Sequence, residues 1–393
     1  MKLFSNDFKK EIDKRLAKLL QIMNSSRTEA LLVNANVNVY YLSGRFYRGY
    51  VYVSAFDPPI WFIVKPEIFD DSEDICYIRK PELISEILSK RGYSIPKTIG
   101  LEFDDLSYTD IIRLKNIFSG SEAINGSRLL RQARMIKTEW EINQMITDGF
   151  HHSRVYSKIK DCFKKGMSDL QFQIEIERQL RLEGSLGVSR VAGNLMEINL
   201  GSVISGENAD TPSPYEFTMG GAGTDSSLPV GADNSEIKSG TTVMIDMNGG
   251  FNGYQTDMTR VWCLGEVSDL AQKAHSCSIR ILRTLEKTAL PGVNVSTLYN
   301  KAFEIVKEMD LLDYFMGHRS KVSFIGHGIG IELNELPVIN AKSKDILATN
   351  MTIAIEPKFV IPSIGAVGIE NTYRVTPVGL ENLTVFPEKI QEL

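Results

Sequence analysis

Five acidic and imidazole side chains in the C-terminal half of the chain place the strongest constraint on its fold. A fold that uses them together must bring five separate short strings to one point: those of Asp246, Asp257, His327, Glu356 and Glu370. Four carboxylates and one imidazole form a ligand set for two divalent cations, which would neutralise the carboxylates. Left unpaired, four buried carboxylates would be prohibitively costly. Two adjacent metal ions can activate a water and polarise a carbonyl, which is the chemistry of amide hydrolysis.

The strings around these residues resemble those of the pita-bread metallopeptidases, a family that includes methionine aminopeptidases, prolidases and Xaa-Pro aminopeptidases. The eleven-residue step from Asp246 to Asp257 and the order Asp, Asp, His, Glu, Glu are those of the family. The resemblance implies that Asp246 binds one metal ion and that Asp257 and Glu370 bridge both ions. It implies that His327 and Glu356 hold the second ion, and that Glu356 also carries the proton of the bridging water.

The activity implied by this resemblance is that of a dinuclear metal-dependent hydrolase. It would be an Xaa-Pro aminopeptidase or dipeptidase, in which a metal-bridging hydroxide attacks the N-terminal peptide bond. Oxygen ligands with one imidazole suit Mn(II), Co(II), Fe(II) or Zn(II). A homodimer is also implied, because the N-terminal domain usually serves dimerisation in the family. Two alternatives stay open: a pita-bread enzyme that hydrolyses a C–N bond of a non-peptide small molecule, and a non-catalytic binding protein, which the intact ligand set disfavours.

Length and composition fit a soluble protein of two domains. The chain has 393 residues, of which 43% are hydrophobic and 24% charged, and its formal net charge of −5 gives no indication of nucleic-acid binding. Its four cysteines form no CxxC pair, which is typical of a reducing compartment. We expect a cytoplasmic protein without a membrane partner, because the sequence shows neither a signal peptide nor a stretch of about 18 apolar residues.

Strands and helices alternate in the first third of the chain, which favours a layered α/β sheet. The string over 38–44 resembles a segment near the start of the creatinase/prolidase N-terminal domain. We therefore predict an α/β domain of this type over residues 1–132. Its expected helices are 8–23 and 81–90, and its expected strands are 30–33, 51–53 and 60–64.

A second domain, an α+β pita-bread catalytic domain, is predicted over residues 133–393. The string over 130–137 resembles the entry into the family's catalytic domain, and Thr138 with Glu141 forms a capping box that begins a helix. Apolar stripes predict one helix over 267–285 and another that opens at Ser296. The metal strings lie on predicted strands at 242–247, 256–263, 352–356 and 368–376.

Three positions depart from the family, whose accessory histidines touch the substrate. They are Val230, Ser323 and Asn334 in this chain. Losing such a hydrogen-bond donor typically costs about 10²–10³ in rate. Asn334 keeps a donor and can partly substitute, whereas Val230 cannot. His318 is a candidate for the missing imidazole if its loop folds over the site, although a histidine beside an arginine is more often solvated.

These departures leave three interpretations open: a divergent peptidase in which another residue fills in, a changed substrate, or a loss of activity. The segment 194–215 also looks longer and more polar than its counterpart in prolidases. Its turn residues predict a surface loop. The alternative is that Asn208, Asp210 or the nearby Asp225 reaches the substrate, because loops of this composition tend to set specificity.

Overall fold

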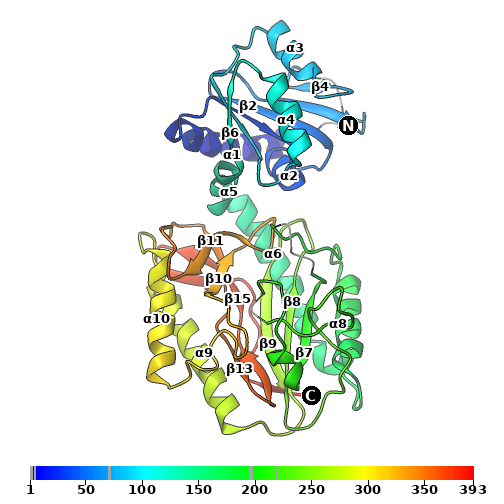
Figure 1. Cartoon of the computed structure of the whole chain (residues 1–393), viewed down its shortest axis with the longest axis vertical. Helices are drawn as coiled ribbons and strands as arrows, with labels where there is room; N and C mark the ends of the chain where they lie inside the picture. The colour runs from blue at the N-terminus through cyan, green and yellow to red at the C-terminus, as the bar shows by residue number, and fades with distance from the viewer. Residues whose placement is uncertain (1–2, 4–5, 70–71, 194–197, 218) are drawn as a thin grey trace. The chain divides into compact units, whose positions relative to one another are not determined.

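The computed structural model describes residues 3, 6–69, 72–193, 198–217 and 219–393 (Figure 1). It divides into two compact units, Met1–Arg134 and Met135–Leu393. The predicted boundary at residues 132–133 falls inside helix α5 (Ser127–Met135), which runs across this division. Within the described ranges, no helix is both long enough and apolar enough to span a membrane.

The first unit is built on a six-stranded mixed sheet in the order β4-β3-β2-β1-β5-β6. Its strands are β1 (Ala30–Val33), β2 (Arg48–Ser54), β3 (Ile60–Lys65), β4 (Ile75–Tyr77), β5 (Thr98–Leu101) and β6 (Glu122–Asn125). Its helices are α1 (Asn6–Ser25), α2 (Asn36–Ser43), α3 (Leu83–Lys90) and α4 (Tyr108–Ile117). Helices α3 and α4 pack on the sheet through Ile84, Leu88 and Leu114. The predicted strands and helices of this unit are confirmed to within a few residues at their ends.

The second unit contains two larger sheets and one hairpin. One sheet has the order β17-β9-β8-β7 and comprises β7 (Gly201–Ser205), β8 (Thr242–Asn248), β9 (Asp257–Cys263) and β17 (Gln391–Glu392). The other has the order β11-β10-β12-β15-β16 and comprises β10 (Phe324–Gly328), β11 (Glu335–Asn340), β12 (Thr352–Ile355), β15 (Asn371–Thr376) and β16 (Gly379–Asn382). The hairpin consists of β13 (Lys358–Ile361) and β14 (Gly365–Gly368). An isolated bridge between Thr259 and Glu370 links the two sheets.

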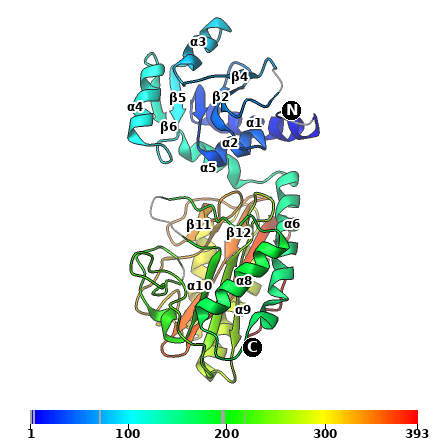
Figure 2. The ribbon, with the colours of Figure 1, turned by 90° about the vertical axis from the view of Figure 1, so that its right-hand side faces the viewer.

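Helices cover the outer faces of the two sheets, as Figures 1 and 2 show. They are α6 (Glu139–Tyr156), α7 (Ile159–Cys162), α8 (Asp169–Glu183), α9 (Asp269–Thr288) and α10 (Val295–Glu308). The helices α6 and α8 share one apolar core with β7, β8 and β9. The helices α9 and α10 share another with β10, β12 and β15. The helices thus lie outside the two sheets, and the predicted α+β pita-bread architecture is confirmed.

Local hydrogen bonds explain where two helices of this unit begin. The capping box is confirmed, since Thr138 Oγ1 accepts from Glu141 N at 3.2 Å and the Glu141 carboxylate accepts from Thr138 N at 2.9 Å. The predicted start of α10 at Ser296 is wrong, because the Asn294 side chain caps the helix by accepting from Ser296 N at 2.9 Å. Asparagine is as good an N-cap as serine.

The surface loop predicted over 194–215 is wrong in part. Residues 194–197 lie outside the described residues, but β7 forms an edge strand that pairs antiparallel with β8. Burial of Val203 and Ile204 against the helical layers explains this, since apolar burial outweighs the polar composition around them. A short 3₁₀ helix follows at Gly206–Asp210.

His275 in α9 gives the unit a testable pH dependence. Its Nε2 lies 2.7 Å from the carbonyl oxygen of Glu388, and burial lowers its pKa from 6.5 to about 4. The unfolded chain takes up a proton near pH 6.5 while the folded chain does not, so stability present above pH 6.5 is lost as the pH falls toward 4. Between pH 7 and pH 5 the wild type should lose about 2 kcal/mol more unfolding free energy than His275→Gln, whose amide can still donate to Glu388. Urea unfolding at both pH values checks this, and equal losses in the two proteins would contradict it.

Candidate metal centre

The hairpin of β8 and β9 places Asp246 and Asp257 on one face of its sheet. The antiparallel register pairs Asp246 with Thr259 and Asn248 with Asp257. Because side chains alternate along a strand, all four point to the same side, and the two aspartates are diagonal neighbours. The eleven-residue spacing seen in the sequence is thus the spacing of two diagonal positions across a hairpin.

The other sheet supplies the imidazole and the two glutamates. His327 lies on β10, whose neighbour β12 ends one residue before Glu356, and β15 begins one residue after Glu370. The prediction that both glutamates lie on strands is therefore wrong by one residue at each boundary, which is the ordinary uncertainty of strand ends. Both side chains are held by the strand backbone that adjoins them.

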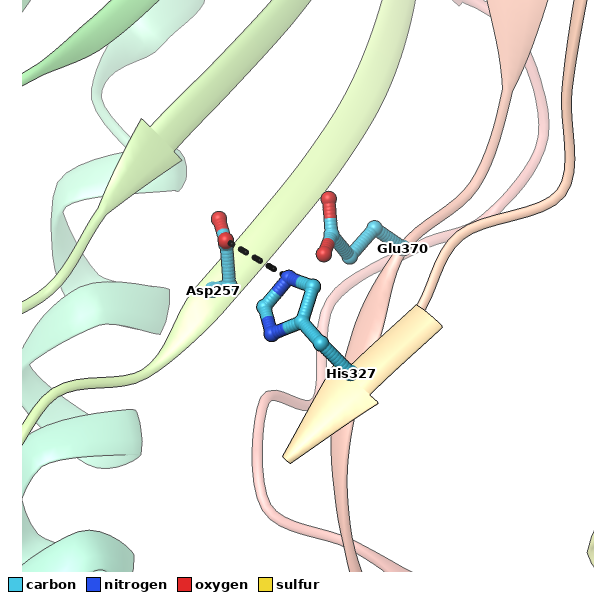
Figure 3. A group of neighbouring side chains, drawn as sticks. All are labelled: Asp257, His327 and Glu370. Atoms are coloured by element: carbon cyan, nitrogen blue, oxygen red, sulfur yellow. Dashed lines mark ion pairs between the residues drawn. The ribbon is translucent and has the colours of Figure 1, made fainter. Parts of the chain in front are cut away.

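Asp257, His327 and Glu370 converge between the two sheets (Figure 3). Ligand atoms of Asp257, His327 and Glu370 all lie within 4.8 Å of one another. His327 Nε2 is 4.0 Å from Asp257 Oδ2 and 3.6 Å from Glu356 Oε1. His327 Nδ1 lies 3.0 Å from the carbonyl oxygen of Gly328, so this nitrogen carries the proton and Nε2 is left as the ligand atom. The assignment of these groups as metal ligands stays a prediction.

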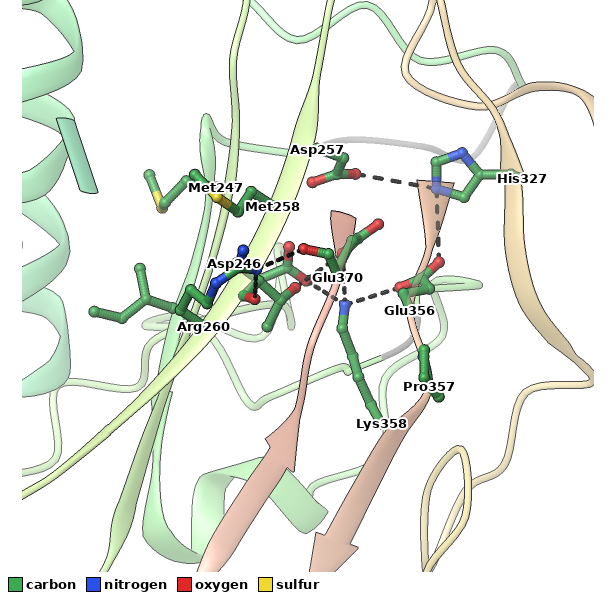
Figure 4. Close-up of polar contacts among 12 residues, drawn as sticks. Asp246, Met247, Asp257, Met258, Arg260, His327, Glu356, Pro357, Lys358 and Glu370 are labelled. Atoms are coloured by element: carbon green, nitrogen blue, oxygen red, sulfur yellow. Dashed lines mark hydrogen bonds and ion pairs between the residues drawn. The ribbon is translucent and has the colours of Figure 1, made fainter. Parts of the chain in front are cut away.

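A lysine that the sequence argument missed lies among the carboxylates (Figure 4). Lys358 Nζ donates to Asp246 Oδ2 at 2.8 Å, to Glu356 Oε2 at 2.8 Å and to Glu370 Oε2 at 3.1 Å. Its side chain has no exposed surface. The sequence does contain a sign of this lysine's role, since Lys358 stands alone between the predicted ligand Glu356 and the apolar run 359–361. A lysine in a buried segment needs an acidic partner, so its position indicates a contact with the carboxylates.

The electrostatics of the cluster call for a further cation. Burial, then the charges of Glu370 and Asp246, raise the pKa of Asp257 well above its usual value, and burial with Glu356 does the same to the pKa of Glu370. Burial disfavours the Lys358 ammonium, but the neighbouring carboxylates outweigh it and hold its pKa well above the usual value. Asp257 Oδ1 and Glu370 Oε1 are buried and accept no hydrogen bond from the described residues. Two unpaired carboxylate oxygens beside a free imidazole nitrogen suit a divalent metal ion.

Residues behind the carboxylates fix their positions. Thr259 Oγ1 donates to Glu370 Oε2 at 2.9 Å, and Asp257 N donates to Thr372 Oγ1 at 2.8 Å. The fully buried Arg260 donates to the carbonyl oxygen of Glu370 at 2.8 Å and to four further oxygens in 371–387. Such support orients metal ligands and keeps the site rigid.

A cavity of about 550 Å³ opens onto the cluster. Asp246, Asp257, His327 and Glu356 lie on its wall. Most of the remaining wall is apolar and includes Ile198, Phe217, Met219, Phe324, Leu333 and Val338. The wall also carries Asn334, whose amide accepts from Ala192 N at 2.7 Å and donates to Ala192 O at 2.9 Å. The predicted role of Asn334 as a donor to the substrate thus competes with its role in holding the cavity wall.

The structure does not bring His318 to this cavity. His318 Nδ1 lies 2.9 Å from Asp210 Oδ2, and its ring stacks on Tyr314. Val230 is buried and is likewise absent from the wall. The three polar residues predicted to reach the substrate bind neighbouring loops instead. Asp210 pairs with His318, and the Asn208 side chain hydrogen-bonds to the backbone at 222 and 231. Asp225 accepts from Ser227. None of these three lines the cavity among the residues described, so their predicted contact with the substrate finds no support.

The fold and the cluster define a metallopeptidase of the pita-bread type. The chain belongs to metallopeptidase family M24, whose sequence pattern matches residues 149–377, and its residues 15–136 match the creatinase/prolidase N-terminal domain. Members of this family typically bind two metal ions. The prediction of a prolidase-like metallohydrolase is confirmed at this level.

Named relatives cover nearly the whole chain. An Xaa-Pro dipeptidase from Pyrococcus furiosus is 26% identical over 377 residues, which cover 94% of this chain and 97% of the relative. A putative dipeptidase, YkvY of Bacillus subtilis, is 26% identical over 79% of this chain and 76% of its own. In fold, the chain is similar to an Xaa-Pro dipeptidase from Bacillus anthracis, with a TM-score of 0.81 at 22% identity over 97% of this chain and all of that one.

Proposed function

We propose that the chain is a metal-dependent exopeptidase that cleaves the N-terminal peptide bond of Xaa-Pro peptides. One observation carries the proposal: the ligand atoms of Asp257, His327 and Glu370 converge, with Glu356 beside them. Asp257, His327 and Glu356 lie on the wall of a cavity of about 550 Å³. Distant relatives at about 26% identity are named Xaa-Pro dipeptidases. Mn(II), Co(II), Fe(II) and Zn(II) suit this donor set.

The proposed chemistry divides between a bound ion and the residues around it. A divalent ion held by this cluster would acidify a water and polarise the scissile carbonyl. Glu356 then accepts the proton of the water at Oε1 and passes it to the leaving amine, while Oε2 stays hydrogen-bonded to Lys358. His327 contributes Nε2, fixed in that tautomer by the carbonyl of Gly328. Thr259 and Arg260 hold Glu370 in place.

The cavity wall supports peptides rather than free dipeptides as substrates. Apolar side chains such as Phe217, Phe324 and Val338 can receive the proline ring and an apolar first side chain. Among the described residues that line the cavity, none is lysine or arginine. The C-terminal carboxylate of a dipeptide would therefore be buried without a cation, which is costly, whereas a longer peptide places that charge outside.

The test is hydrolysis of a panel of Xaa-Pro and Xaa-Ala dipeptides and of longer Xaa-Pro peptides. The protein is loaded with Mn(II) or Co(II) and compared with the same protein stripped by a chelator and with Asp257→Ala. We expect metal-dependent release of the first residue from Xaa-Pro peptides, with higher kcat/KM for the longer ones. Light scattering of the same preparation tests the homodimer, which we propose from the match to the creatinase/prolidase N-terminal domain.

No turnover of any peptide by protein that demonstrably holds metal would sink the peptidase proposal. It would favour the alternative of a non-peptide small molecule with a hydrolysable C–N bond. The observation behind that alternative is that Val230 replaces an accessory histidine and that the Asn334 amide is engaged with Ala192.

A further inference from the structure

We propose that the Lys358 ammonium takes the place of one of the two metal ions of the family, so that this chain binds a single divalent ion. The inference concerns the site of the proposed function and rests on it only for the expectation that a metal binds at all. It starts from the position of Nζ, which lies 2.8 Å from Asp246, 2.8 Å from Glu356 and 3.1 Å from Glu370 (Figure 4). These three carboxylates come from three separate segments of the chain.

The ammonium and its partners match in number and in geometry. A lysine ammonium has three N–H donors, and here each carboxylate accepts one of them. A divalent ion bound by the same three oxygens would lie about 2.0–2.2 Å from each, in the space that the nitrogen fills. The ion would also face a positive charge fixed beside it. The position bounded by Asp246, Glu356 and Glu370 therefore already holds its cation.

The second position keeps its ligand atoms, because Glu356 and Glu370 each hydrogen-bond to the lysine through only one carboxylate oxygen. Glu356 presents Oε2 to Lys358 and Oε1 to His327, at 3.6 Å from Nε2. Glu370 Oε2 accepts hydrogen bonds from Lys358 and Thr259, and Glu370 Oε1 accepts no hydrogen bond from the described residues. Asp257 Oδ1 is unpaired in the same sense. Asp257, Glu370 and His327 thus bring two carboxylates and one imidazole together, with Glu356 beside them, and three protein ligands suit one catalytic ion.

The backbone is built to admit the lysine. Lys358 opens β13 and pairs with Gly368 on β14. A Cβ on Gly368 would lie 2.8 Å from Lys358 Cα and 2.9 Å from its Cγ, so any larger residue there would push the lysine stem aside. The glycine lets the long side chain run through a fully buried passage to the carboxylates.

The test counts metal ions. Protein stripped with a chelator is titrated with Mn(II), binding is followed by calorimetry, and bound metal is measured by mass spectrometry of the protein after removal of free ions. We expect one ion per chain, with the six-line paramagnetic resonance spectrum of an isolated Mn(II). Lys358→Ala should bind two ions and show the spectrum of a coupled pair, whereas Lys358→Arg, which keeps a cation, should still bind one.

A second variant keeps the inference testable if Lys358→Ala does not fold. Asp246→Asn removes a partner of the lysine but no ligand of the open position, so it should keep one ion with an affinity within about tenfold of the wild type. Two ions of similar affinity in the wild type, one of them lost in Asp246→Asn, would overturn the inference. The result is separable from the peptidase proposal: one ion without peptide hydrolysis would contradict only that proposal, and hydrolysis with two ions only this inference.

Discussion

Glu356→Gln is expected to lower kcat by about 10²–10⁴-fold when both proteins are compared at saturating metal. Glu356 is buried, lies on the cavity wall and is 3.6 Å from His327 Nε2. Glutamine has nearly the same shape, and its carbonyl oxygen can still accept from Lys358. It cannot accept a proton, however, so it removes the step in which the proton passes from water to the leaving amine.

The measurement is kcat and KM on the best Xaa-Pro peptide, together with metal content. A fall in kcat with little change in KM would identify an interaction made in the transition state. Glu216→Gln is the matched control, because Glu216 lies on the same cavity wall but is exposed and outside the carboxylate cluster. It should leave kcat nearly unchanged. If Glu356→Gln kept more than a tenth of the wild-type kcat, another group would have to carry the proton.

Arg260→Met is expected to cost more than about 4 kcal/mol of unfolding free energy, which is an exceptional loss for one substitution. The Arg260 side chain is fully buried, and its guanidinium donates to Thr259 O and Glu370 O at 2.8 Å each. It also holds the backbone of 384–387 through three more carbonyl oxygens. Methionine fills the space but offers no donor. Thr259 O and Glu370 O keep a backbone N–H partner, whereas the three carbonyl oxygens in 384–387 lose the guanidinium at about 1–3 kcal/mol each.

The loss is measured by urea unfolding of the metal-free proteins. Arg260→Lys should recover only part of it, since a single ammonium cannot reproduce the planar fork of five donors. Arg280→Met in α9 is the control, because Arg280 is about half exposed and pairs with the exposed Glu308. Surface ion pairs contribute about 0–1 kcal/mol, so this control should lie close to the wild type. Equal losses in the two methionine variants would contradict the role given to Arg260.

The parts of the site that sequence could predict are those carried by short local strings. Asp246 and Asp257 were identifiable because a hairpin fixes their spacing, and the order of the remaining ligands identified the family. Lys358 was missed because two of its three partners, Asp246 and Glu370, are farther away in sequence, and a lysine after a proline carries no family pattern. His318 was considered for the cavity on proximity to His327 alone, whereas the fold turns it toward Asp210.

Element types were more predictable than element edges. Short runs of apolar residues identified β1, β2 and β8, because a strand that is buried on both faces is apolar along most of its length. The strand β7 was missed, since its flanks are rich in turn residues and only its pairing with β8 makes it a strand. The N-cap at Asn294 was also missed. Asparagine and serine are equally good N-caps, so the sequence does not distinguish Asn294 from Ser296 as the start of α10.

The division of the proposed ligands between two sheets also determines when a metal centre could form during folding. The hairpin β8–β9 carries Asp246 and Asp257, but His327 follows only after α9 and α10 in the chain. A chain that has formed the hairpin alone therefore offers two carboxylates, too few for tight binding. The ligand set is complete only when the sheets have docked across a long sequence separation, which is a late event. Metal should accordingly slow unfolding of the native state far more than it accelerates folding.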